Sequence, residues 1–309
     1  MAKLTVLLPG CLASILVSQS AAAATYFQVQ LDRVQFTSAD GPDETWRLAR
    51  NFVYMEHALS RLTGMKLPAE MRRTTVWCLA RRDWSVATKD SPKLRDVDAQ
   101  QRVVNDEWLV ILNGCSLQKE GLRRAFAVHA QHLLDSAGLG NYPLWYRAGF
   151  AHLMSSAEVI SPTQVKVGSV PVVASPAIRS PGEVTASELF DAQSWNEMPF
   201  RERVFHLGRA WTLVQYSVVG GAERQARLNA LAAAIAAGTP AEAALRAHFD
   251  VDYQGLDKVL NAHLKTRPVA WKMNMPQDLE AKVPNAHLVD PEAVAAFLAE
   301  WQKLAGEDG

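Results

Sequence analysis

Two histidines, His129 and His132, stand three residues apart in a segment whose apolar residues have helical spacing. Side chains at this separation lie on one face of a helix, close enough to share one cation. In a zinc helix of the H-E-x-x-H type, two imidazoles bind the metal and a glutamate activates a zinc-bound water molecule. Here Val128 occupies the position of the first imidazole, and His129 occupies that of the glutamate. Of the residues that perform this chemistry, only His132 remains.

The next helical segment, PLWYRAGFAHL, runs from Pro143 to Leu153 and resembles the P-x-W-x-x-E-G-x-A-E segment of gluzincin metallopeptidases. More narrowly, the chain is similar to a family of largely uncharacterised secreted bacterial proteins with a peptidase-MA-like domain. In that family the glutamate before the glycine is the third zinc ligand, and Ala148 occupies its position here. The resemblance therefore implies a zinc-peptidase frame in which Val128 and Ala148 replace two of the three metal ligands.

A different set of ligands would restore a metal site. His152 lies one helical turn beyond Ala148, so His129, His132 and His152 together offer three imidazoles for zinc, with an open position for water. In the alternative interpretation, His129 is a hydrogen-bonded core residue, and His132 and His152 line a groove that Trp145 supports by packing. We favour this second interpretation, because no carboxylate base stands beside the histidines.

The first 24 residues are typical of a secretory signal peptide. Lys3 gives a positive start, Leu4–Val17 forms an apolar stretch, and Ala21–Ala24 is a run of small residues suited to cleavage. Lipidation at Cys11 is not expected, because the apolar stretch continues past it. We therefore expect an exported protein of the periplasm or the extracellular space, and not a lipoprotein.

Charge and hydropathy exclude two classes of partner. The chain has 32 basic and 32 acidic side chains, so removal of Lys3 with the signal leaves 31 against 32. A chain this close to neutrality lacks the electrostatic driving force for binding nucleic acid or an anionic membrane. No apolar segment is long enough to cross a bilayer, so no transmembrane segment is expected.

Two cysteines, Cys78 and Cys115, remain after removal of the signal segment. An even number of cysteines in an exported chain favours a disulfide, which would contribute about 3–4 kcal/mol by restricting the unfolded state. The alternative is two separate buried thiols, because a free cysteine packs as a small apolar side chain.

The pattern of apolar residues predicts an α+β fold, and the resemblance specifies it as gluzincin-like, with a mixed sheet packed on helices and a helical C-terminal lobe. The polar segment 85–105 is expected to be a surface excursion. Helices are predicted at 43–64 and 118–136, and strands within 26–38, at 74–80 and at 108–113. The expected domains are a signal peptide at 1–24, a peptidase-MA-like lobe at 25–156, a hairpin or irregular excursion at 157–198, and a helical lobe at 199–309.

The resemblance predicts a pseudopeptidase, a non-catalytic protein with a binding or structural role in the cell envelope and without a cofactor. Metallopeptidases of this type hold a peptide in extended form along an edge strand beside the zinc helix, and such backbone pairing needs no metal. The expected partner is therefore an extended peptide or a segment of an envelope protein. Two alternatives stay open: a zinc-dependent hydrolase that uses His129, His132 and His152, and a structural protein with a filled groove.

Overall fold

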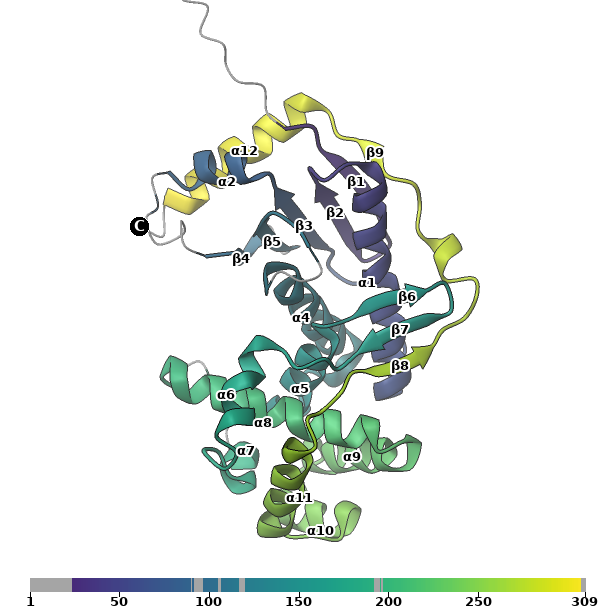
Figure 1. Ribbon diagram of the computed structural model, residues 1–309, viewed down its shortest axis with the longest axis vertical. Coiled ribbons are helices and arrows are strands. Elements are labelled where there is room, and N and C mark those ends of the chain that lie inside the picture. Colours follow the sequence, from purple (N-terminus) through teal and green to yellow (C-terminus); the bar gives the residue numbers. More distant parts are fainter. Residues whose placement is uncertain are drawn as a thin grey trace, which may run out of the picture.

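Figure 1 shows the computed structural model of the protein, which describes residues 24–89, 91, 97–104, 107–116, 120–191, 195 and 197–306. A six-stranded sheet with helices on both faces forms one end of the molecule. Helices form the other end, and a three-stranded sheet lies between the two ends, alongside the long helix α1.

The main sheet has the strand order β4-β5-β3-β2-β1-β9, so β4 and β9 are its two edges. Strands β2, β3 and β5 run parallel to one another, whereas β4–β5, β1–β2 and β1–β9 are antiparallel pairs. The sheet is therefore mixed. Its strands are β1 (Phe27–Gln30), β2 (Val34–Ser38), β3 (Thr74–Leu79), β4 (Ala99–Val104), β5 (Glu107–Asn113) and β9 (His287–Leu288).

The alternation of side chains along each strand divides the core between the two faces of this sheet. On one face, Val76 of β3 packs in the larger buried cluster with helices α1 (Pro42–Thr63) and α4 (Glu120–Leu134). On the other face, helices α2 (Arg81–Ala87) and α12 (Pro291–Gly306) cover a smaller cluster that is rich in aromatic residues. There Trp77 stacks on Phe297 of α12, with the ring centroids 3.9 Å apart.

Helices α4 and α5 (Leu144–Met154) pack against each other and carry the two segments that were singled out in the sequence. The turn between them contains Gly138 at φ 81°, a left-handed conformation that glycine adopts at little cost. On its other side α5 packs on α8 (Phe200–Val219), where a Cβ on Gly149 would lie 2.7 Å from the Ala210 carbonyl oxygen. Gly149 is therefore required for the close approach of these two helices.

The three-stranded sheet has the order β6-β7-β8 and is held against α1 by polar contacts. The side-chain oxygen of Asn51 accepts a hydrogen bond from the Val159 amide at 2.8 Å, and Tyr54 donates to the Pro162 carbonyl at 2.7 Å. Its strands are β6 (Glu158–Ser161), β7 (Gln164–Val167) and β8 (Trp271–Asn274). The remaining helices are η1 (Asp135–Leu139), η2 (Val172–Ala174), α6 (Ser175–Arg179), α7 (Ala186–Asp191), α9 (Ala222–Ala236), α10 (Ala241–Phe249), α11 (Tyr253–Lys265) and η3 (Glu280–Lys282).

The structure confirms an α+β fold with a mixed sheet and a helical region toward the C-terminus. It corrects the interpretation of segment 85–105, whose described part contains the end of α2 and the edge strand β4. The prediction that residues 199–309 form only a helical lobe is also incomplete. After α11 the chain adds β8 to the small sheet and β9 to the main sheet, and α12 covers a face of the main sheet.

Residues 157–198 begin with the predicted hairpin, formed by β6 and β7, and continue into short helices in their described part. Within the described residues, no helix combines the length and the apolar character needed to cross a bilayer. The predicted signal segment lies outside the described residues, except for Ala24.

Candidate functional site

His129, at the position of the catalytic glutamate in the zinc-helix pattern, is completely buried between α4, α1 and β3. Its Nε2 atom lies 2.8 Å from a carboxylate oxygen of Glu56 on α1, and its Nδ1 atom lies 2.8 Å from the hydroxyl of Thr74 on β3. Its ring also makes an edge contact with Phe52. Both ring nitrogens are therefore occupied by protein partners, as expected of a hydrogen-bonded core residue.

Glu56 is the anionic member of this cluster and is 4% exposed. A guanidinium nitrogen of Arg33 lies 2.9 Å from the second carboxylate oxygen of Glu56. Burial raises the pKa of Glu56, but the hydrogen bond and charge of His129, together with Arg33, outweigh burial and hold the pKa below its ordinary value. Glu56 is therefore ionised at neutral pH and paired on both sides.

His132 is 8% exposed, more than either His129 or Glu56. Its Nδ1 atom lies 3.3 Å from the Thr74 hydroxyl, and its ring lies 5.9 Å from that of Trp108 on β5. Burial, followed by the charges of His129 and Arg72, lowers the pKa of His132 to about 4. At neutral pH His132 is therefore an uncharged imidazole.

The hydroxyl of Thr74 connects the two histidines: its oxygen lies 2.8 Å from Nδ1 of His129 and 3.3 Å from Nδ1 of His132. The Nε2 atom of His129 lies against Glu56, whereas Nε2 of His132 has no partner within this group of residues. We call Arg33, Glu56, Thr74, His129 and His132 the Glu56–His129 cluster; only His132 keeps a ring nitrogen without a partner in it.

The two other ligand positions implied by the resemblance have hydrocarbon side chains. Val128 is partly buried and packs against the main core, and Ala148 on α5 is 6% exposed. Neither side chain has an atom that coordinates a cation. The retained glycine of the motif, Gly149, is explained by the packing of α5 on α8 and not by a ligand beside it.

The alternative three-histidine site does not assemble in this geometry. His129 would have to leave Glu56 and Thr74 to offer a lone pair to a metal. His152 is partly buried on α5, and burial with the nearby charge of Arg124 lowers its pKa to about 4. In the described part of the chain, no three His, Cys, Asp or Glu side chains lie close enough together to hold a metal ion.

Trp145, expected to support the groove, is a core residue that is 1% exposed. Its ring packs on Phe190 of α7, at 5.0 Å between centroids, and on Tyr146 at 5.8 Å. It therefore joins α5 to the short helices that follow the small sheet, and it is not available to a ligand. Of the four histidine and tryptophan residues expected at the groove, only His132 and His152 reach the surface.

The edge strand β4 presents backbone groups on its outer side. The Asn113 amide donates to the Asp98 carbonyl at 2.9 Å, and from this pair the alternation of an antiparallel ladder can be followed along β4. In this alternation the backbone N–H and C=O groups of Ala99, Gln101 and Val103 point away from β5. The Ala99 carbonyl accepts from Arg124 at 3.3 Å, but no described residue bonds to the outward groups of Gln101 or Val103.

A strip of side chains joins this edge to the cluster. Val103 is 54% exposed and lies directly opposite Trp108 in the β4–β5 pair. Because paired residues share a face of the sheet, both side chains point toward α4, where Trp108 meets His132. Val103, Trp108 and His132 therefore form a continuous surface from the outer edge of β4 to the helix that resembles a zinc helix.

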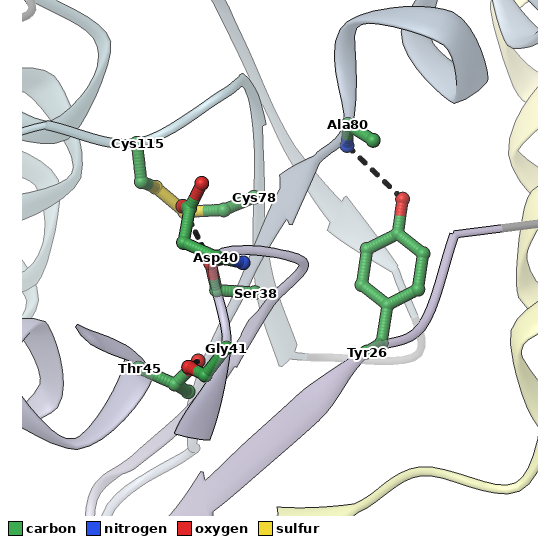
Figure 2. Close-up of a disulfide and its surroundings, with 8 residues drawn as sticks. All are labelled: Tyr26, Ser38, Asp40, Gly41, Thr45, Cys78, Ala80 and Cys115. Atoms are coloured by element: carbon green, nitrogen blue, oxygen red, sulfur yellow. Dashed lines mark hydrogen bonds between the residues drawn. A yellow bond between two sulfur atoms is a disulfide. The ribbon is translucent and has the colours of Figure 1, made fainter. Parts of the chain in front are cut away.

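Cys78, in β3, and Cys115, just after β5, form a disulfide with Cα atoms 5.6 Å apart (Figure 2). β3 and β5 are parallel neighbours, so the bridge joins them where both strands end. The loop that leads into α1 lies beside it, with Ser38 hydrogen-bonded to Asp40. Of the two arrangements left open by the sequence, the structure has the bridged one.

No family model matches the chain, and no curated protein shows significant sequence similarity to it. The resemblance to peptidase-MA-like proteins therefore rests on the residues of α4 and α5 and on the order of the surrounding elements. It stays a prediction.

Proposed function

We propose that this protein is exported and non-catalytic, and that it binds a short extended peptide segment along the outer edge of β4. The observation that carries the proposal is the pair of outward residues Gln101 and Val103, whose backbone groups have no partner among the described residues. An extended chain satisfies such groups by adding a strand to the sheet. Its side chains on the α4 side would cover Val103 and contact Trp108.

Loss of metal chemistry supports a binding role for this frame. Hydrocarbon occupies positions 128 and 148, and the imidazole at position 129 is held in a buried pair with Glu56. Within the cluster only His132 has a ring nitrogen without a protein partner, and zinc in catalytic sites takes three protein ligands. The surface that would receive a substrate backbone does not depend on these groups.

The size of the edge limits the affinity. Gln101 and Val103 offer two amide donors and two carbonyl acceptors, which contribute roughly 2–6 kcal/mol at about 0.5–1.5 kcal/mol for each hydrogen bond. Covering the exposed part of Val103 adds about 1 kcal/mol. Before the cost of ordering the peptide, this sum corresponds to a Kd no tighter than roughly 10 µM. Tighter binding requires apolar partner side chains on the strip formed by Val103, Trp108 and His132.

Two features support export. The alanine run that precedes Thr25 follows an apolar stretch of signal-peptide type. A bridge such as Cys78–Cys115 is typical of proteins in oxidising compartments, because thiols in the cytosol are kept reduced. The proposed location is therefore the periplasm or the extracellular space, where extended segments of envelope proteins are available.

The proposal is tested with a displayed library of random dodecapeptides, selected on the mature protein and then measured as free peptides by calorimetry. Val103→Pro removes an outward amide and leaves the β4–β5 ladder intact, since proline is tolerated at a sheet edge. Val103→Thr is the matched control, because it keeps both the amide and the β-branched shape. We expect the Kd to rise at least about tenfold in the proline variant and to stay within about twofold in the threonine variant.

Amide exchange locates the bound peptide independently of the variants. The amides of Gln101 and Val103 should exchange more slowly when a selected peptide is present. Equal binding by both variants, or protection confined to other strands, would show that the edge of β4 is not the binding site. An unchanged melting temperature in Val103→Pro is required to attribute its lost binding to the edge.

A further inference from the structure

Asp83, on α2, is a buried carboxylate without a cationic partner among the described residues. It is 6% exposed, and no positively charged group of the described chain lies within ion-pair distance of it. It accepts a hydrogen bond from the Tyr26 hydroxyl at 2.8 Å, and the Ala24 amide nitrogen lies 3.4 Å from the same oxygen. A carboxylate at this depth is stable only when its charge is compensated.

Tyr26 cannot supply the compensating charge. Its hydroxyl donates to Asp83 and accepts from the Ala80 amide at 3.1 Å, the contact drawn in Figure 2. Burial, reinforced by Asp83 and Asp40, raises the pKa of Tyr26 well above its ordinary value, so the phenol stays neutral. The remaining contact of Asp83 is the nitrogen of Ala24, which is uncharged as long as it belongs to a peptide bond.

We propose that the peptide bond between Ala23 and Ala24 is hydrolysed during maturation, and that Asp83 binds the new α-ammonium group of Ala24. Hydrolysis adds one water molecule across the bond, which leaves a carboxylate on Ala23 and a protonated amine on Ala24. A signal peptidase, which requires small residues at the first and third positions before the cut, finds them in Ala23 and Ala21.

The contact with Asp83 indicates which peptide bond of the alanine run is hydrolysed. The run Ala21–Ala24 satisfies the small-residue rule in more than one register, and the sequence alone places the end of the signal at residue 24. A cut after Ala24 would remove the nitrogen that faces Asp83, and a cut after Ala22 would leave that nitrogen in an amide. Only hydrolysis after Ala23 places the positive charge on the atom next to the buried carboxylate.

The pair would join three parts of the fold. Ala24 and Tyr26 lead into β1, Asp83 belongs to α2, and all of them border the aromatic cluster that α12 covers on this face of the sheet. Maturation would therefore stabilise the side of the sheet opposite the Glu56–His129 cluster. This inference does not depend on peptide binding at β4.

The first test is the N-terminus of the protein exported from the full chain, determined by mass spectrometry. Ala24 is the expected first residue, and a predominant terminus at any other residue would overturn the proposal. The second test uses mature protein released from a cleavable fusion with either Ala24 or Gly-Ser-Ala24 at its start. The added dipeptide should raise the unfolding equilibrium constant at least about tenfold.

The same two proteins, starting with Ala24 or with Gly-Ser-Ala24, are then compared in an Asp83→Asn background. The dipeptide should have little effect in this background, because the carboxylate that binds the ammonium group is absent. An equal effect in both backgrounds would overturn the proposal. If Asp83→Asn does not fold, acetylation of the terminal amine decides instead: it should be at least tenfold slower in the native protein than in the denatured one, and equal rates would refute the pairing.

Discussion

The Glu56–His129 cluster and the outer edge of β4 are two polar regions that differ in how far their hydrogen-bonding groups are satisfied within the protein. In the cluster, both nitrogens of His129 and both oxygens of Glu56 are bonded to protein groups. At the edge, the outward backbone groups of Gln101 and Val103 have no partner in the described chain. Polar groups that are satisfied within the protein stabilise it, whereas exposed and unsatisfied backbone groups can receive another chain.

This contrast separates a polar cluster that stabilises the core from a sheet edge that can receive another chain. His129 and Glu56 are buried, with both ring nitrogens and both carboxylate oxygens bonded to protein groups, so they act as core residues. The proposed binding edge at Gln101 and Val103 is open and needs no metal. The following changes test whether the two regions are as different as their contacts indicate.

The largest effect is expected from restoring the ligands. Val128→His combined with Ala148→Glu returns two metal donors beside His132, whose Nε2 atom has no partner in the cluster. We expect the natural protein to retain no zinc after dialysis and the double variant to retain one zinc per chain. An affinity in the micromolar range or tighter corresponds to at least about 8 kcal/mol.

Without zinc, the double variant should be less stable than the natural protein, because a glutamate at the buried position 148 lacks a partner. Added zinc should reverse this loss, as measured by melting temperature with and without chelator. A folded double variant that binds no zinc would show that α4 and α5 do not have metallopeptidase geometry.

Glu56→Ala should cost about 3–5 kcal/mol of unfolding free energy, because it leaves the buried His129 and the partly buried Arg33 without their anion. Urea denaturation measures the change. Glu56→Gln is the matched control: it keeps the shape of the side chain and one acceptor oxygen, and its loss should be smaller. Equal losses below about 1 kcal/mol in both variants would mean that the cluster does not stabilise the core.

Removal of the disulfide with Cys78→Ala and Cys115→Ala should cost about 3–4 kcal/mol, because the bridge closes a loop with a sequence separation of 37. The natural protein, denatured in the presence of a reducing agent, should show the same loss of unfolding free energy. A double variant as stable as the oxidised natural protein would contradict this assignment.

Acid should destabilise the fold through His132. Its pKa of about 4 lies below the ordinary 6.5, so between these pH values the unfolded chain binds a proton that the folded chain does not. Stability is therefore fully present above pH 6.5 and falls as the pH is lowered toward 4, by roughly 1–3 kcal/mol. His132→Gln should flatten this slope in urea titrations, whereas His248→Gln, at a partly exposed position of α10, serves as the control.

Local patterns in the sequence predicted much of the fold and little of the site. The apolar patterns of α1, β3 and β5 predicted the bounds of these elements to within a residue or two. Strand β4 was missed, because half of AQQRVV is polar, as can occur in an edge strand. The contact of Glu56 with His129 joins residues 73 apart in the chain, which helical periodicity does not reveal. A carboxylate within the apolar stripe of α1 was the available signal for a buried partner.

The measurement that tests the central claim most directly is the binding of a selected peptide in the presence of chelator and in the presence of zinc, with the mass of the peptide determined before and after. If the frame acts through the β4 backbone and not through a metal, the Kd is the same in both conditions and the peptide is recovered intact. A peptide that binds only with zinc, or that is recovered cleaved, would contradict the account.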